Sequence, residues 1–568
     1  MAKTPEVKTF AADFVIIGGG TAGLVLAARL SEDPKTVVIV IESGPDCTDD
    51  PLVQNPENWP KLQKSDVDWN FQVEQQVSST EFPLQPENQH PAGRMLGGSS
   101  ALNGMVFLPP SPAGIDAWAK LGNPNWNWES IRPYLLKSYS VTAPKLIPEM
   151  DLGESKLATG PIQVSYPALE DRENHPLLEA WCNALRHKGY DYVEDILSER
   201  KTIGSRAFSA TIDPASGLRS SANSTYGSII ANRPNVVVYT NTTAVRIHFD
   251  HLSASTVEVK QGTDNNGLWN TMQFSARKEI ILAAGALQSP KLLQLSGVGC
   301  KHLLAKHDIH ALVDLPGVGE NLQNHLMMIT STPLKSHIEP GFKALAMTRI
   351  SPEEQKKLLC TYPVPKTESE KVLKSIIEDS NEATASFFLS TSDKLAHFGL
   401  VTSYPFTRGT VKLNDSIYPF RPATIDFKFS HPLDKEMLAY QFRDLQNLIH
   451  SEQLREFVRC CGDSDDSECK KDQHGPGLLK EYTSQVVNMA HHACGTAAML
   501  PRDDGGVVDQ NLFVYGTRKL RVVDASIFPI IPHGNPIATV YAVAERAADI
   551  IKDAHNIPIP DAPTNALS

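Results

Sequence analysis

The sequence predicts an α/β protein with two parts: a parallel sheet assembled from segments far apart in the chain, and a second domain built on a mixed β-sheet. The first observation is the run 13–42, which has the pattern of a buried strand, a glycine turn, a helix and another buried strand. The second is that apolar runs of this kind return only after residue 236, and once more at 520–524. Between them, roughly 322–480 is richer in proline and charge, and we expect it to form most of the second domain.

Composition limits the classes of function. The 568 residues carry 53 Lys and Arg against 65 Asp and Glu, a formal net charge of −12, and 41% of them are hydrophobic. This apolar share is ordinary for a globular protein with a large core. An acidic surface repels phosphate backbones, which argues against a nucleic-acid partner. No apolar run approaches the roughly 20 residues that span a bilayer, so we expect no membrane insertion.

Residues 13–42 carry a glycine frame typical of dinucleotide binding. Gly18, Gly20 and Gly23 fill the pattern G-x-G-x-x-G, which allows a tight turn, close approach of the backbone to a pyrophosphate, and close packing of helix on strand. Amides at the start of the following helix favour negative charge. Glu42 ends the next strand, where its carboxylate can accept the ribose hydroxyls. Together these features predict a Rossmann-like dinucleotide site.

Later segments complete the predicted sheet. Strand-like runs cover 236–239, 244–247, 256–259 and 279–283. The last run begins with charge, becomes apolar and stops at Gly285, as expected of a central strand that ends at a ligand. A short strand at 520–524 then precedes residues 536–552, which show helical periodicity.

Several blocks resemble the glucose–methanol–choline (GMC) flavin oxidoreductases, in that family's order. Residues 94–107 (RMLGGSSALNGMVF) resemble the first family signature, and residues 285–299 (GALQSPKLLQLSGVG) match the second at every specified position. Residues 315–325 (LPGVGENLQNH) resemble the segment that follows, with Asn324 where Asp is usual. Near the end, 492–496 (HACGT) resembles a His-x-x-Gly-Thr element, and 524–549 resembles the closing strand and helix.

The resemblance implies FAD as the cofactor. The FAD domain would comprise 10–321, with inserted substrate-domain segments, and 481–553; the range 322–480 would be mainly substrate-binding, and 554–568 a tail. By analogy, the residues expected to bind FAD are Gly18, Gly20, Thr21, Ala22, Gly23, Glu42, Ser43, Ser99, Asn103, Gly104, Met105, Val106, Val245, Ala525, Asn535, Pro536 and Ile537. Within this set Val245 would touch the adenine. Leu102 stands where some relatives carry a histidine that attaches FAD covalently, so we expect non-covalent FAD.

Flavin oxidation of an alcohol needs a general base, because the alcohol gives up a hydride readily only as its O–H proton leaves. The resemblance implies His492 as this base and Asn535 as its catalytic partner. Asn535 directly precedes Pro536, so its side chain could instead cap the helix 536–552. The adjacent His491 would point away from the site if this segment is extended.

Other reactive residue types near these blocks leave alternatives open. Cys494 could form an adduct with flavin or substrate, or be a small buried apolar residue, which is the commoner case. His533 could line the pocket or face solvent. Cys460, Cys461 and Cys469 bracket an acidic stretch, which permits a local disulfide without demanding one. No metal-binding motif is present, and we expect no metal site.

The resulting hypothesis is FAD-dependent oxidation of an alcohol to a carbonyl, with hydride transfer to flavin N5 and O₂ or another acceptor taking the electrons. Residues 107–118 (FLPPSPAGIDAW) resemble fungal members near the aryl-alcohol oxidases, so an aromatic or otherwise apolar alcohol is expected. Two alternatives remain, a non-redox lyase or cyclase on the same scaffold and a flavin-binding protein without catalysis. Residues 1–10 lack the apolar core of a secretory signal, which favours a cytoplasmic protein, although a removed signal would allow secretion.

Overall fold

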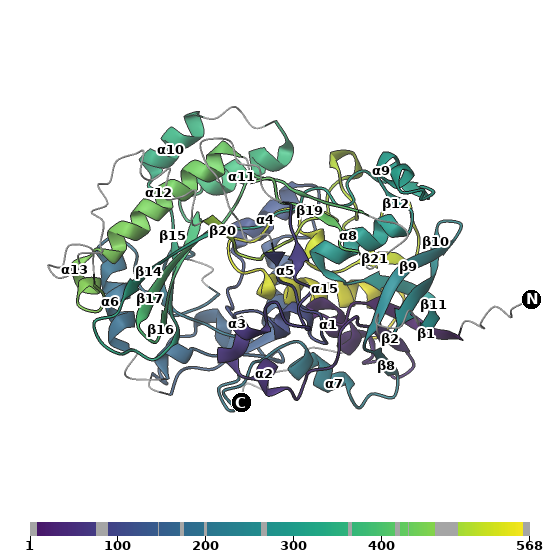
Figure 1. The fold of residues 1–568 in the computed structure, drawn as a ribbon, viewed down its shortest axis with the longest axis horizontal. Helices are drawn as coiled ribbons and strands as arrows, with labels where there is room; N and C mark the ends of the chain where they lie inside the picture. The colour runs from purple at the N-terminus through teal and green to yellow at the C-terminus, as the bar shows by residue number, and fades with distance from the viewer. Residues whose placement is uncertain are drawn as a thin grey trace, which may run out of the picture.

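The computed structural model describes ten stretches of the chain, and two large sheets lie on opposite sides of the molecule (Figure 1). The described residues are 8–74, 89–145, 147–170, 175–197, 201–262, 270–361, 366–414, 421–429, 431–459 and 487–559. Cys460, Cys461 and Cys469, for which a disulfide was considered, lie outside them. None of the described helices is long and apolar enough to cross a membrane.

The first sheet contains every strand expected from the sequence. Its order is β8-β2-β1-β11-β10-β9, and β21 pairs with β11. The strands are β1 (Lys8–Ile17), β2 (Val38–Ile41), β8 (Val236–Tyr239), β9 (Thr242–Asp250), β10 (Ser253–Gln261), β11 (Asn270–Leu282) and β21 (Leu520–Val522). Strands β8, β2, β1, β11 and β21 run parallel, whereas β10 pairs antiparallel with both β11 and β9. Parallel strands are covered on both faces, which explains their continuous apolar runs.

The second sheet faces the first across the molecule and has the order β20-β14-β17-β16-β15-β7. Its strands are β7 (Gly204–Ala207), β14 (Leu326–Pro333), β15 (Gly341–Thr348), β16 (Ala385–Ser392), β17 (Leu395–Thr402) and β20 (Val487–Met489). The α/β class is confirmed, and one detail differs from expectation: these pairs are all antiparallel, so the mixed sheet is the first one. Strands β16 and β17 are joined by a tight turn, which allows only antiparallel pairing.

Helices and short strand pairs fill the rest of the described chain. The helices are α1 (Thr21–Leu30), α2 (Pro51–Gln54), α3 (Trp59–Leu62), α4 (Pro112–Lys120), α5 (Trp128–Ser138), α6 (His175–Arg186), α7 (Ser228–Ile230), α8 (Gly285–Leu295), α9 (Lys301–Lys306), α10 (Pro352–Thr361), α11 (Glu368–Glu378), α12 (Pro432–Ile449), α13 (Glu452–Arg455) and α15 (Ile537–Ala554). The short strands are β3 (Phe71–Gln72), β4 (Gln89–His90), β5 (Tyr139–Val141), β6 (Ile162–Val164), β12 (Val298–Gly299), β13 (Val313–Asp314), β18 (Thr410–Lys412) and β19 (Thr424–Asp426).

A buried ion pair fixes α15 against α1. Nε and Nη2 of Arg29 donate to both carboxylate oxygens of Glu545 at 2.8–3.0 Å, and the hydroxyl of Tyr226 donates to the same carboxylate at 2.7 Å. The Glu545 side chain is fully buried. A buried charge is costly unless it is paired and hydrogen-bonded, as it is here. The contact therefore specifies how α15 lies, and with it where the start of this helix points.

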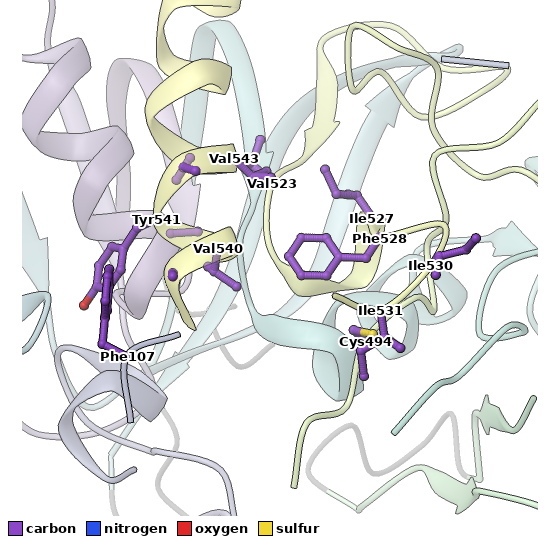
Figure 2. Packing of buried hydrophobic residues seen from close by; sticks show 14 of the residues in the cluster. Phe107, Cys494, Val523, Ile527, Phe528, Ile530, Ile531, Val540, Tyr541 and Val543 are labelled. Carbon is purple, nitrogen blue, oxygen red and sulfur yellow. The ribbon is translucent and has the colours of Figure 1, made fainter. Parts of the chain in front are cut away.

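Apolar residues from the end of the chain pack behind this helix. Figure 2 shows Tyr541 on α15, with Phe528 and Ile531 in the segment that leads towards it. All three are fully or almost fully buried, as is Cys494, whose side chain lies beside Ile531 in the same view. None of these four side chains lines the cavity described next.

Candidate active site

A cavity of about 550 Å³ connects the two sheets. At one end it is lined by the carboxyl ends of β1 and β2, through Gly18 and Glu42. At the other end it is lined by side chains of the second sheet, including Phe342 of β15 and Phe388 of β16. Open α/β sheets bind ligands at the carboxyl ends of their strands, as this position would.

Most of the site residues predicted from the sequence line this one cavity. They are Gly18, Gly20, Thr21, Ala22, Glu42, Ser43, Ser99, Asn103, Gly104, Met105, Val106, His492, Ala525, Asn535, Pro536 and Ile537. Gly23 and Val245 do not line it. Gly23 packs under the turn, where a Cβ would lie 1.9 Å from the oxygen of Gly18. Val245 is buried at a β-bulge, where the register of β9 against β10 shifts, and its neighbours Thr243 and Ala244 line the cavity instead.

Two glycine turns form the floor of the cavity. Gly18 has a φ of 107° and Gly97 a φ of 95°, values that side chains disfavour. A Cβ on Gly18 would lie 2.4 Å from the oxygen of Ala283, and one on Gly98 would lie 2.8 Å from Cα of Gly20. The two backbones therefore touch directly. A Cβ on Gly20 would meet only Cα of Gly98 within 4 Å, so there is room beside this residue, which lines the cavity.

Glu42 is held beside this floor by backbone amides. Its two carboxylate oxygens accept from the amides of Gly19 and Gly44, each at 2.9 Å. Burial raises the pKa of Glu42 to about 7, against the opposing effect of these amides and of Arg94. A ligand hydroxyl that donates to this carboxylate would favour its charged form.

One supporting residue was missed by the sequence argument. Arg219 is almost fully buried, and its Nη1 donates to the backbone oxygen of Asn103 at 2.7 Å and to Oδ1 at 3.0 Å. Its Nε donates to the oxygen of Val53 at 3.0 Å. Arg219 thus holds the loop that contains Asn103 and Met105 from behind. No motif contains this arginine, so only the fold could assign it this place.

His492 and Asn535 meet at the centre of the cavity wall. Nδ2 of Asn535 donates to Nε2 of His492 at 3.0 Å. The alternative in which Asn535 caps the last helix is wrong: the helix begins at Ile537, Pro536 occupies the cap position, and no side chain caps it. Burial, followed by the neighbouring histidines, holds the pKa of His492 well below its ordinary value. His492 is therefore neutral at neutral pH.

A short segment before β14 holds His492 in place. The backbone of Gln323 exchanges two hydrogen bonds with Cys494, at 2.9 and 3.1 Å. Oδ1 of Asn324 accepts from the amide of His492 at 2.8 Å. Nδ1 of His325 lies 2.8 Å from Nδ1 of His492, and the two rings are perpendicular. Residues 323–325 belong to a block with a recognised resemblance, but the sequence assigned no role to Asn324 or His325.

Two further histidines lie along the same wall. His491 was expected to point away because the segment was taken as extended, but its φ is 62° and its ring lines the cavity. It packs edge-on against His90, with ring centroids 5.2 Å apart. Burial lowers the pKa of His90 to about 3 and that of His491 to about 4. These rings are neutral as well.

Comparison with known proteins decides the family. The GMC oxidoreductase family matches residues 12–327 with its N-terminal domain and 405–544 with its C-terminal domain. The chain belongs to the GMC oxidoreductase family. It is 31% identical to dehydrogenase pkfF of Emericella nidulans, over 95% of this chain and 93% of that protein.

Solved structures agree with this assignment. An FAD-dependent oxidoreductase from Chaetomium thermophilum is 27% identical, with a TM-score of 0.84 over 96% of this chain and 100% of the other. A fungal aryl-alcohol oxidase is 26% identical, with a TM-score of 0.79 over 96% and 99%. This GMC oxidoreductase is thus an FAD-dependent enzyme acting on alcohols.

The cavity of this GMC oxidoreductase fits FAD at its first end. Gly20 lines the cavity at the start of α1 and leaves room beside it, which suits a diphosphate at the positive end of this helix. The buried carboxylate of Glu42 suits a ribose. Among the described residues, no group of three or more His, Cys, Asp and Glu side chains is arranged to hold a metal ion.

Aromatic side chains form the other end. Phe208 and Phe342 are stacked, with centroids 4.6 Å apart and planes at 6°. Trp59 lies 6.3 Å and Phe388 6.0 Å from Phe342. Of the described residues that line the cavity, only Glu42 and Asp524 carry a carboxylate, and both belong to the FAD end.

Two residues with open roles lie outside the cavity. Cys494 is fully buried among apolar side chains, and burial raises the pKa of its thiol, so it is a packing residue. His533 neither lines the pocket nor faces solvent. Its Nδ1 lies 3.0 Å from Oε1 of Glu382 and its Nε2 lies 3.1 Å from the oxygen of Pro109, and both histidine and glutamate are buried. These contacts tie the segment before Asn535 to the second sheet's domain.

Asn324→Asp should shift the acid side of the pH profile. The aspartate would still accept from the amide of His492, but it would add a negative charge close to the imidazole. A nearby opposite charge raises a histidine pKa by about 1–3 units. A histidine that serves as general base acts only when neutral, so with His492 in that role the fall of kcat/KM in acid should move to higher pH by that amount.

The control is Asn125→Asp, the same change at an exposed position remote from the cavity. It should leave the pH profile where it is. An Asn324→Asp enzyme with an unmoved acid limb would contradict the argument from charge.

Gly399→Ala should narrow the aromatic end of the cavity. Gly399 pairs with Phe388 across β16 and β17, and a Cβ there would lie 1.9 Å from Cζ of that ring. The ring would have to move towards the cavity that it lines. We expect KM for a bulky aromatic alcohol to rise by about tenfold. Adding Phe388→Leu should reverse the effect; if KM stays raised in the double variant, the ring is not the cause.

Proposed function

We propose that this enzyme oxidises an aromatic or otherwise apolar primary or secondary alcohol to its carbonyl, with His492 as the general base. The observation that carries the proposal is a neutral histidine whose Nε2 faces a cavity with an aromatic, carboxylate-free far end. The similarity to an aryl-alcohol oxidase structure supports the same substrate class.

His492 would take the hydroxyl proton on Nε2. Burial keeps the ring neutral, so the lone pair is available without prior loss of a proton. In the structure Asn535 donates to that lone pair at 3.0 Å. A substrate hydroxyl that gives its proton to Nε2 would displace this amide, which would then be within reach of the hydroxyl oxygen. It would orient the substrate oxygen while the proton leaves.

FAD, when bound, supplies the hydride acceptor at N5. The chain would hold it through the first glycine turn at the start of α1 and through Glu42. The start of α15 also lines the cavity, through Ile537. The positive end of this helix would favour negative charge on the adjacent part of the cofactor.

We propose that the FAD is dissociable. Leu102, which lines the cavity, offers no nucleophile at the position where some relatives carry the linking histidine. Precipitation with acid should release all of the yellow colour into the supernatant. Flavin that stays with the denatured pellet would show a covalent bond.

The substrate end favours ring contacts over charge. Phe208, Phe342 and Trp59 present aromatic faces, and such contacts contribute about 0.5–1.5 kcal/mol each beyond the area that they bury. A cationic alcohol would find no carboxylate among the described residues at this end. Aromatic alcohols should therefore reduce the enzyme better than choline or sugars.

The test mixes the purified enzyme, without oxygen, with benzyl alcohol, cyclohexylmethanol, choline and glucose, and follows the visible flavin band. We expect bleaching by benzyl alcohol first, and admission of air then separates an oxidase from a dehydrogenase. A band that no alcohol bleaches would contradict the proposal and favour a non-redox lyase or cyclase.

His492→Ala should keep FAD bound but lower turnover by about 100- to 10,000-fold, the range for loss of a general base. Turnover and the flavin absorbance per protein are the two measurements. An unchanged kcat would remove His492 from the mechanism, whereas loss of FAD would show that it serves the fold.

A further inference from the structure

We propose that His325 is a positioning residue that accepts the Nδ1–H of His492 and so keeps the lone pair of the base on Nε2, facing the cavity. The proposal rests on the proposed role of His492 as base and extends it. It assigns a function to a residue that touches neither FAD nor substrate, since the residues lining the cavity do not include His325.

The contact is short and shielded from water. The two Nδ1 atoms lie 2.8 Å apart, within the range of a good hydrogen bond, and the rings are perpendicular at a centroid distance of 5.1 Å. The side chain of His325 is fully buried. Since two nitrogens at this distance cannot both carry a proton, one donates and the other accepts.

The direction follows from the other nitrogen of His492. Nε2 lies 3.0 Å from Nδ2 of Asn535, which is a donor, so Nε2 carries the lone pair. The single proton of the neutral ring is therefore on Nδ1, and His325 must be the acceptor. Its own proton then lies on Nε2, a buried nitrogen that has no hydrogen-bond partner among the described residues.

His325 can keep this role throughout turnover because it stays neutral. Burial lowers its pKa to about 3, so it remains an acceptor at any ordinary working pH. When His492 takes a proton on Nε2, its Nδ1–H still points at His325, and the bond becomes a stronger, charge-assisted one. A carboxylate does this in the Ser–His–Asp triad; here a neutral ring fixes the tautomer without adding charge.

The test compares three substitutions of His325. The amide oxygen of Asn can reach the place of Nδ1 and accept from His492, Gln places its amide further out, where Nε2 was, and Leu offers no polar group. We expect His325→Asn to keep kcat within about tenfold of the parent. His325→Gln and His325→Leu should lose about 10- to 100-fold in kcat beyond that, with KM little changed. The flavin content and Tm of each variant are measured alongside.

A structural role would give a different pattern. If Asn, Gln and Leu lower kcat equally, or if KM and flavin content fall with kcat, His325 supports the fold and the proposal is overturned. A kcat that none of the three changes would overturn it too.

A direct readout does not depend on turnover. In holoenzyme carrying ¹⁵N-labelled histidine, the signals missing from His492→Ala belong to His492, and their chemical shifts show which ring nitrogen carries the proton. We expect the proton on Nδ1 in the parent and in His325→Asn; a proton on Nε2 in the parent would overturn the proposal. Full activity of His492→Ala would instead overturn the proposed base and leave this measurement unaffected.

Discussion

The active site depends on one constraint: His492, the proposed base, must be buried yet remain neutral. Burial removes the water that would stabilise an imidazolium, and it lowers the pKa of His492 accordingly. What remains is to hold an uncharged ring by hydrogen bonds. Residues 323–325 do this from one side and Asn535 from the other, so the amide and both ring nitrogens of His492 have partners. No charged group takes part in these contacts.

A buried carboxylate joins two segments of the FAD domain that lie far apart in the sequence. Oδ2 of Asp524, which follows β21, accepts from the amide of Gly285 at 2.9 Å and from the hydroxyl of Ser289 at 2.6 Å, where α8 begins. Oδ1 accepts from the amide of Ser526 at 2.7 Å. A single buried carboxylate thus connects the end of β11 with the segment that carries Asn535. This connection explains why residues some 240 positions apart can form one cavity wall.

The sequence predicted what local patterns determine. The glycine frame, the strands of the first sheet and the last helix all follow from periodicity and turn chemistry, which act over a few residues. It failed where orientation decides: at a register shift in β9, Ala244 rather than Val245 lines the cavity, and a positive φ turns His491 into it. His325 and Arg219 could not be found at all, because their partners lie 167 and 116 positions away.

Neither the contacts of His492 nor the described residues at the aromatic end include a carboxylate, and this bears on specificity. Asn324 in place of the usual Asp, and a histidine where a triad has a carboxylate, both spare His492 a negative neighbour. Without such a neighbour its proton affinity stays low, and burial keeps its pKa well below the ordinary value. The aromatic end likewise offers no carboxylate among its described residues. A substrate then gains little from charge on either side. Discrimination must come from ring contacts and from the room that Phe388, packed directly over Gly399, leaves in the cavity.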